Sequence, residues 1–462
     1  MLLTMLMALV MVIPAFAAGN TYTITINNST SGHTYEAYQV FAGDLSSNGK
    51  ILSNITWGDG VNEDTLLTAL KSDKTIGTRF ADCGTAADVA AVLDDFGNDS
   101  VQLDAFAAVV GNNLSDTKTF STEGTGSYSI SDLAAGYYFV KDSDNSNITG
   151  NDAYTKFMLK LVNSITVTLK SDVPTVEKKV QEDDKYKQDG DYGNGYNDVA
   201  DWNIGDNVPF KLIGTIPEMD GYDTYKYIFH DTMSKGLTLN EDSIQVYVVN
   251  AKNTSLDSAK ALTVNEDYTL TTSALSDKCS FEVSFADLKK VEGATKGSYI
   301  IVSYTAILNE NAEIGLPGNP NEVYLEFSNN PAESGEGDTD NTGKTPEDKV
   351  IVFTYELDTT KVDGTNTNIT LKDAEFVLLN KDGNKVANVD STTGKFKGWV
   401  DLPSGTGTNS EIVYSDWTEK NETTNVILKS DDNGLFKVIG LDDGDYKLRE
   451  IKAPDGYNLL TK

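Results

Sequence analysis

The stretch Tyr446-Lys-Leu-Arg-Glu-Ile-Lys-Ala-Pro-Asp-Gly-Tyr457 decides how the C-terminal part of this chain folds. Tyr446, Leu448 and Glu450 alternate in it, and alternate residues of a β-strand point to the same face of a sheet. The first two are core-type side chains, so the pattern predicts that the Glu450 carboxylate also turns inward. Because an unpaired buried charge is costly, Glu450 is expected to hold a proton or to meet a cationic partner.

This YxLxExxAPxGY pattern resembles the E-box of the Cna B-type domains of Gram-positive surface pilins, and every motif position is present in residues 446–457. In that family the glutamate promotes an intramolecular isopeptide bond between a lysine and an asparagine. The resemblance implies an all-β fold of tandem immunoglobulin-like sandwiches, with Glu450 as a promoting acid.

The strand pattern that begins at Phe353 continues at every second residue to Lys361. This row supplies Lys361 as the partner of Glu450. The asparagine of this third-domain site is expected beyond Lys462, where one more strand would complete the sandwich, so the sequence reads as truncated.

Polar residues also interrupt apolar rows in the middle of the chain. The rows are Tyr225, Tyr227 and Phe229 before Asp231, Val176 and Val180 around Lys178, and Val323, Leu325 and Phe327 after Asn321. Burial favours a neutral amine and a neutral carboxylic acid. A neutral amine is a nucleophile, and a protonated carboxyl beside an amide can shuttle protons while ammonia leaves. The hypothesis is a bond from Lys178 to Asn321, promoted by Asp231.

Other interpretations of these residues stay open. Lys179 replaces Lys178 if the strand register slips by one residue, and Asn329 is a weaker alternative to Asn321. Lys178 could simply extend to solvent from a strand edge. Asp231 and Asn321 could each belong to a turn.

From Pro174 to Pro331 the chain resembles the second domain of sortase-assembled fimbrial backbone subunits. The resemblance is carried by Lys178-Lys-Val180, Asp231-Thr-Met-Ser-Lys-Gly-Leu237 and Asn321-Glu-Val-Tyr-Leu325. It implies that these segments supply the lysine, the acid and the asparagine.

Such subunits also carry a VxVYPK-like pilin motif at the end of the first domain, and a sortase joins its lysine to the next subunit. Lys170 occupies that place, although Thr168 and Leu169 replace the Tyr and Pro of the motif. The resemblance therefore implies that Lys170 is the intersubunit linkage residue.

Leader and composition indicate an exported protein. The apolar residues 1–17 end in Ala15-Phe-Ala17, which predicts a signal peptide over residues 1–18 and a mature protein beginning near Ala18. The usual basic segment is missing, because no Lys or Arg precedes Lys50, and an uncleaved anchor is the alternative. With 70 acidic and 37 basic residues the net charge is -33, which excludes nucleic acid as a partner.

The pattern along the chain predicts three domains. Residues 19–170 read as an N-terminal pilin domain of strands with a few helices, and 171–330 as an isopeptide-forming β-sandwich. Residues 331–349 read as a polar linker, and 350–462 as a Cna B-type sandwich. Cys83 and Cys279 fall in different domains and are expected to be free, buried thiols.

The function that follows is structural. The chain is expected to be a subunit of a covalently polymerised cell-wall pilus that supports adhesion, with identical subunits, a sortase and a host surface protein or glycan as partners. The alternative is a nonpolymerising adhesin or tip pilin. An enzyme is not expected, since His230 and Asp231 are adjacent in a strand and face opposite ways. No cofactor or metal is expected either, because the stretch Asp338–Gly343 lacks the glutamate that would complete an EF-hand loop.

Overall fold

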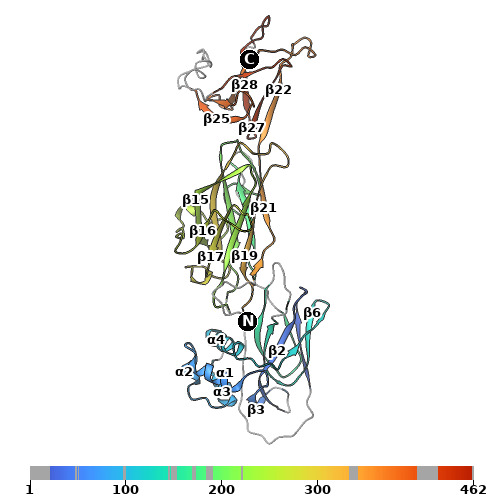
Figure 1. Cartoon of the computed structure of the whole chain (residues 1–462), viewed down its shortest axis with the longest axis vertical. Helices are drawn as coiled ribbons and strands as arrows, with labels where there is room; N and C mark the ends of the chain where they lie inside the picture. Colours follow the sequence, from blue (N-terminus) through green and yellow to red (C-terminus); the bar gives the residue numbers. More distant parts are fainter. Residues whose placement is uncertain are drawn as a thin grey trace.

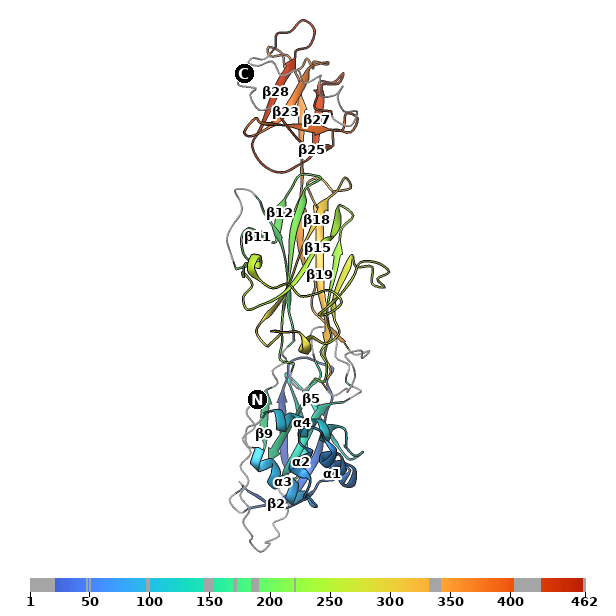
Figure 2. The ribbon, with the colours of Figure 1, turned by 90° about the vertical axis from the view of Figure 1, so that its left-hand side faces the viewer.

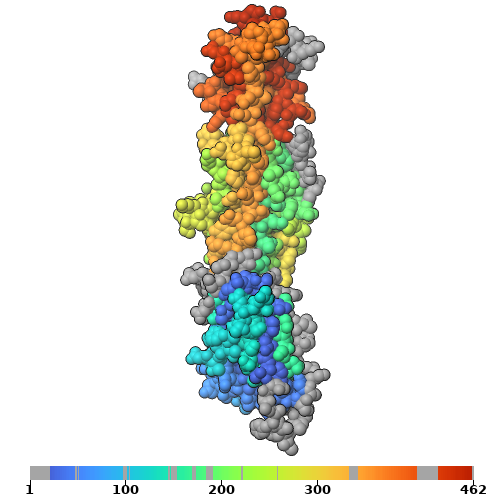
Figure 3. All heavy atoms as spheres, turned by 90° about the vertical axis from the view of Figure 1, so that its right-hand side faces the viewer, coloured from blue at the N-terminus to red at the C-terminus, as the bar shows by residue number. Residues whose placement is uncertain are grey.

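The computed structural model describes residues 21–46, 49, 51–96, 100–143, 146, 153–168, 173–183, 191–219, 222–331, 342–402 and 425–459. Within them the chain forms three units that follow one another along a long axis (Figures 1 and 2). The space-filling view shows the same elongated rod, with the units in sequence order (Figure 3). Strands predominate in all three units, and the α-helices of the described residues lie in the first, which confirms the predicted fold class.

The first unit combines two sheets with a group of helices. Its elements are β1 (Tyr22–Asn27), β2 (Tyr35–Leu45), β3 (Leu52–Trp57), α1 (Glu63–Ser72), α2 (Gly77–Phe80), α3 (Ala86–Phe96), α4 (Ser100–Gly111), β4 (Thr119–Phe120), β5 (Thr122–Gly124), β6 (Ser127–Leu133), β7 (Gly136–Asp142), β8 (Lys156–Leu161) and β9 (Ile165–Thr168). The sheets have the strand orders β5-β6-β1-β9 and β3-β2-β7-β8, with β4 paired to β2. Apolar residues three and four apart turn the helices onto the second sheet, where Phe80, Phe106 and Phe139 share a core with the free thiol Cys83. Among the described residues, no helix combines the length and apolar character needed to cross a membrane.

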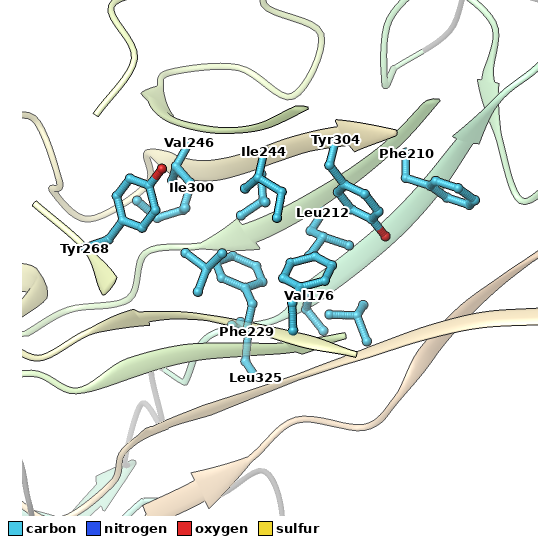
Figure 4. Close-up of a cluster of buried hydrophobic side chains, with 14 of the residues drawn as sticks. Val176, Phe210, Leu212, Phe229, Ile244, Val246, Tyr268, Ile300, Tyr304 and Leu325 are labelled. Carbon is cyan, nitrogen blue, oxygen red and sulfur yellow. The ribbon is translucent and has the colours of Figure 1, made fainter. Parts of the chain in front are cut away.

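The middle unit is a sandwich of two sheets. Its elements are β10 (Val176–Gln181), β11 (Tyr196–Asn197), β12 (Val199–Asp201), β13 (Asn207–Thr215), β14 (Tyr227–Met233), β15 (Leu237–Val249), η1 (Leu256–Ser258), β16 (Thr269–Thr271), β17 (Phe281–Phe285), η2 (Leu288–Lys290), β18 (Tyr299–Leu308), β19 (Asn319–Ser328), β20 (Thr342–Lys344) and β21 (Asp348–Phe353). One sheet has the order β11-β10-β13-β18-β15, and the other β12-β21-β19-β14-β17-β16 with β20 on β19. Their inward side chains meet in one apolar core, with Phe229 and Leu325 on one side and Leu212 and Ile300 on the other (Figure 4).

The end of the middle unit differs from the predicted boundary. The prediction placed a linker at 331–349 and the start of the third domain at Val350, but β20 and β21 both pair with β19 in the middle unit. Val350 and Val352 are fully buried in the middle core, which explains why this alternating segment folds there. The alternating row from Phe353 to Lys361 is thus split between β21 and the next strand, which lie in different sheets.

The third unit is a smaller β-structure. Its elements are β22 (Tyr355–Thr360), β23 (Glu375–Asn380), β24 (Lys385–Val389), β25 (Phe396–Asp401), β26 (Leu428–Lys429), β27 (Leu435–Leu441) and β28 (Tyr446–Lys452). β22 pairs with β27, and the other sheet has the order β25-β24-β23-β26, with β28 also on β23. The sequence predicted that Leu448 and Glu450 of β28 both point inward. This prediction is confirmed for Glu450, which is 6% exposed, and wrong for Leu448, which is 40% exposed. In the described part of the chain β28 pairs with β23 alone, so β28 is an edge strand there.

Acidic groups crowd at the junction between the middle and third units. Asp443 N donates to Asp201 Oδ2 at 3.0 Å, and Asp201 N donates to Glu182 Oε2 at 3.2 Å. Burial and then the Glu182 charge raise the pKa of Asp201 to about 7. Burial and then the Asp201 charge raise the pKa of Asp442 to about 9. The junction therefore favours protonated carboxyls.

The stability of this junction is expected to fall as pH rises. An unfolded Asp titrates near about 3.9, so between about pH 4 and about pH 9 the folded junction binds more protons than the unfolded chain and loses stability with rising pH. Asp442→Asn removes one ionisable group, so its stabilisation relative to wild type should be larger at about pH 8 than at about pH 5. Scanning calorimetry of the chain expressed from residue 19, which keeps the middle and third units joined, measures this difference. An equal difference at both pH values would contradict the prediction.

Candidate functional site

Three strands bring Lys178, Asp231 and Asn321 together in the middle unit. β10 carries Lys178 in one sheet, while β14 and β19 carry the other two residues in the facing sheet. Lys178 Nζ lies 2.5 Å from Asp231 Oδ2 and 2.5 Å from Asn321 Oδ1. It also donates to the main-chain oxygen of Glu322 at 3.1 Å. The lysine thus crosses the sandwich and ends against two polar groups of the opposite sheet.

The three side chains are enclosed by aromatic rings. Lys178, Asp231 and Asn321 are each 0% exposed. Lys178 Nζ lies 6.0 Å from the ring centroid of Phe210 and 5.9 Å from that of Tyr304. These two rings stack on each other at the end of the core, as Figure 4 shows. The amine, the carboxyl and the carboxamide therefore meet in an interior of low dielectric constant.

Tyr304 of β18 completes the cluster and was not identified from the sequence. Its hydroxyl donates to Asp231 Oδ2 at 2.8 Å and accepts from Asn321 Nδ2 at 3.0 Å. Tyr304 is 1% exposed and belongs to the alternating buried row of β18. A tyrosine in such a row has a hydroxyl that needs a hydrogen-bond partner inside the core. This need was the sequence signal by which Tyr304 could have been assigned to the cluster.

The enclosure shifts both ionisable partners toward their neutral forms. Burial lowers the pKa of Lys178 to about 8, although the Asp231 charge opposes the shift. Burial likewise raises the pKa of Asp231, against the influence of Lys178. Asp231 Oδ1 has no hydrogen-bond partner within the described residues. The site can therefore hold a nucleophilic amine next to a carboxyl that carries a proton.

The two alternative residues lie elsewhere. Lys179 points to the other face of β10, where its Nζ lies 2.5 Å from Asp198 Oδ1 and 4.6 Å from the Tyr192 ring centroid. Asn329 follows the end of β19, and its main-chain oxygen accepts from Tyr154 N of the first unit at 2.6 Å. The geometry thus groups Lys178 with Asn321.

In the third unit the structure brings Lys361 and Glu450 together. Lys361 Nζ lies 3.0 Å from Glu450 Oε1 and 5.9 Å from the Phe376 ring centroid. The Glu450 side chain is 0% exposed and the Lys361 side chain 15%. Glu450 pairs with Phe376 across β28 and β23, while Lys361 follows the end of β22. This amine and carboxyl repeat two of the three groups of the middle site.

Other predicted features fall outside the described residues. These are Lys170, the leader over residues 1–18, and residues 338–341 of the acidic stretch. The last two residues of that stretch, Thr342 and Gly343, belong to β20.

Family comparisons agree with the motifs. Residues 204–331 match the Cna-B-like domain of Gram-positive pilin backbone subunit 2, and residues 406–462 match a prealbumin-like fold domain. The first match includes Asp231 and Asn321, and the second includes Glu450. The resemblance to backbone pilins is therefore confirmed.

One relative and two solved structures are similar to this chain over most of its length. The trypsin-resistant surface T6 protein of Streptococcus pyogenes serotype M6 is 24% identical over 478 residues, which cover 97% of this chain and 72% of that protein. The solved T6 backbone pilin of serotype M6, described as a modular three-domain structure, has a TM-score of 0.55 at 20% identity and covers 97% of this chain and 80% of that chain. The full-length major pilin SpaD from Corynebacterium diphtheriae has a TM-score of 0.47 at 16% identity, over 95% of this chain and 88% of that chain. The T6 backbone pilin therefore has a fold similar to that of this chain.

The two neighbouring lysines are expected to differ in their effect on stability. Lys178→Met removes the amine that contacts Asp231 and leaves this buried carboxyl without that partner, which should cost about 3 to 5 kcal/mol of unfolding free energy. Lys179→Met is the matched control, because Asp198 is 71% exposed and stays solvated, so the cost should be about 1 kcal/mol or less. Denaturant unfolding of the middle unit measures both. Equal costs would show that the enclosed cluster has no special role.

Proposed function

The chain carries a Gram-positive pilin backbone domain, and from this premise we propose that it is a structural subunit of a covalently polymerised pilus on the bacterial surface. Its middle unit forms an internal isopeptide bond between Lys178 and Asn321, promoted by Asp231. The observation that carries this proposal is a fully buried amine in contact with both a carboxyl and a carboxamide.

Stability alone is a poor explanation of this cluster. Apolar residues of similar volume often stabilise a core as well as a buried ion pair or better. A covalent crosslink, by contrast, needs one nucleophile, one electrophile and one acid, and the cluster holds one of each. The name of the T6 relative includes trypsin resistance. A bond across the sandwich would give this chain the same property, because it limits the unfolding that exposes cleavage sites.

The reaction is an amide exchange between two side chains. The neutral Lys178 amine attacks Asn321 Cγ, a C–N bond forms, and the bond from Cγ to Nδ2 breaks to release ammonia. Asp231 contacts the amine and takes up its proton, while the acid proton passes to the leaving nitrogen. Tyr304 contacts both Asp231 and Asn321 Nδ2, so it connects the acid to the leaving group. The folded core holds these groups in contact, which raises the rate of an otherwise slow exchange.

The position of the bond suits a subunit under tension. Lys178 lies on the first strand of the middle unit and Asn321 on β19, 143 positions later. A pulling force that enters through β10 would pass through the bond directly to β19. Strands β11 to β18 would then carry no load, and the unit would resist extension.

The third unit and the linkage between subunits complete the proposal. Lys361 and Glu450 act as the amine and the promoting acid of a second internal bond. A sortase joins Lys170 to the next identical subunit, and the assembled pilus supports adhesion to a host protein or glycan. The chain is thus a sortase substrate and not an enzyme with a diffusible substrate. The alternative is a nonpolymerising adhesin or tip pilin, which would share the internal bonds but not the Lys170 linkage.

The internal bond predicts a change in mass. Loss of one ammonia should make the chain expressed from residue 19 lighter by about 17 Da. Peptide mapping should then find a branched peptide that joins Lys178 to Asn321. Asp231→Ala should abolish both signals, because the promoting acid is lost.

Asp348→Asn is the matched control for this experiment. Asp348 accepts from Lys178 N at 2.7 Å but has no contact with Nζ among the described residues, so the variant should keep the mass deficit. An unmodified wild-type mass would refute the crosslink.

The ability to polymerise distinguishes a shaft subunit from a nonpolymerising adhesin. Coexpression with a cognate pilin sortase should give a ladder of covalent oligomers in denaturing gels. Lys170→Ala should abolish the ladder, whereas Lys156→Ala should keep it, because Lys156 Nζ contacts the Pro331 main-chain oxygen at the junction of the first two units. A ladder that persists in Lys170→Ala would refute the assignment of Lys170, and no ladder in wild type would favour the nonpolymerising adhesin.

A further inference from the structure

A second group of polar side chains lies on the outer face of the middle unit. His230 and Asp231 are neighbours on β14, so they face opposite sides of the sheet. While Asp231 points into the core, His230 meets Asp277, Cys279 and Glu282 on the outside. Each of the four residues offers one candidate ligand atom, and these four atoms all lie within 4.8 Å of one another.

Two neighbouring strands and one loop create this group. β14 pairs with β17 so that His230 lies directly opposite Glu282. The segment that leads into β17 adds Asp277 and Cys279, and Cys279 N donates to Asp277 Oδ1 at 3.1 Å. His230 Nδ1 lies 2.8 Å from Asp277 Oδ2 and 3.3 Å from Glu282 Oε1. Cys279 Sγ lies 3.8 Å from the same Glu282 oxygen.

We propose that His230, Asp277, Cys279 and Glu282 form a zinc-binding site. One imidazole, one thiolate and two carboxylates make up four ligands of the types that Zn²⁺ accepts in tetrahedral sites. Calcium and magnesium prefer oxygen ligands alone, so the imidazole and the thiol select against them. Binding converts the Cys279 thiol to a thiolate and releases its proton to solvent.

The surroundings of the four residues support a metal site. His230 Nε2, the ring nitrogen that would not bind the metal, lies 3.6 Å from Glu326 Oε2. Lys226 Nζ holds the other oxygen of Glu326 at 3.0 Å. Tyr324 donates to Asp277 Oδ2 at 2.8 Å, and its ring stacks on the imidazole with centroids 4.4 Å apart. At 3.6 Å the contact of His230 Nε2 with Glu326 is at an ion-pair distance and is not a hydrogen bond, so Glu326 supplies negative charge behind the imidazole of a metal ligand without fixing its tautomer.

The four candidate ligands differ in their exposure to solvent, and this difference suits ion binding. His230 and Cys279 are buried, at 6% and 8% exposure. The side chains of Asp277 and Glu282 remain 27% and 20% exposed. An ion can therefore reach the carboxylates from solvent and then contact the two buried ligands. Bound zinc would tie β14 to β17 and to the preceding loop, on the face of the sheet opposite Asp231.

Cobalt titration tests the site directly, because Co²⁺ takes the place of zinc and reports thiolate ligation by a charge-transfer band. The metal-free, reduced chain expressed from residue 19 should develop this band, saturate at about one Co²⁺ per chain and lose the band when Zn²⁺ is added. An excess of Ca²⁺ should leave it unchanged. Glu326→Gln should weaken Co²⁺ binding by about 10-fold, since the negative charge behind the imidazole is removed.

The two cysteines of the chain give a matched pair of variants. Cys279→Ser should abolish the band, whereas Cys83→Ser should keep it, because Cys83 is a free, buried thiol of the first unit. No band in the wild-type chain would refute the site, even if a variant failed to fold. A band that survives Cys279→Ser, or that is lost in Cys83→Ser, would also refute it. His230 would then be a histidine paired with surface carboxylates only.

Discussion

The middle unit depends on the burial of one amine in an apolar core. Charge inside such a core is poorly solvated, so an amine and a carboxyl in contact there are both driven toward their neutral forms. Lys178 and Asp231 meet this constraint by contact with each other and with Asn321 and Tyr304. Burial makes a charged pair of Lys178 and Asp231 unfavourable. Because burial also favours the neutral amine, it makes Lys178 a nucleophile. Enclosure by the two sheets is thus the physical basis of the proposed crosslink.

The sandwich topology determines what such a crosslink can do. β10 and β19 lie in different sheets and far apart in the sequence, so a bond between them closes the unit across its core. β21 continues from this unit to the third one, and main-chain hydrogen bonds join the two units, such as that from Ile204 N to Gly440 O at 2.9 Å. Any side chain at Gly440 would meet Ile204, since a Cβ there would lie 2.4 Å from the nearest Ile204 atom. The middle and third units are therefore joined by main-chain hydrogen bonds as well as by the chain that connects them.

β14 has two distinct chemical faces. Its inner face holds Asp231 beside an amine, and its outer face holds His230 among carboxylates and a thiol. The alternating geometry of a strand keeps these neighbours apart, so each can take part in different chemistry. The zinc site was missed from the sequence because its residues become neighbours only through strand pairing. The available signal was the spacing of Asp277, Cys279 and Glu282 before and within a strand.

Strand alternation by itself determined which polar residues are enclosed, because residues two apart share a face whatever surrounds them. The burial of Asp231, Asn321 and Glu450 was predictable for that reason. The motifs in the sequence also indicated the family and the tandem β-fold. Strand alternation also favoured Lys178 over Lys179, whereas tertiary structure alone decided that Tyr304 joins these groups and that β21 closes the middle unit. Those outcomes depend on which strands lie opposite one another, and contacts between residues far apart in the chain leave no trace in local periodicity.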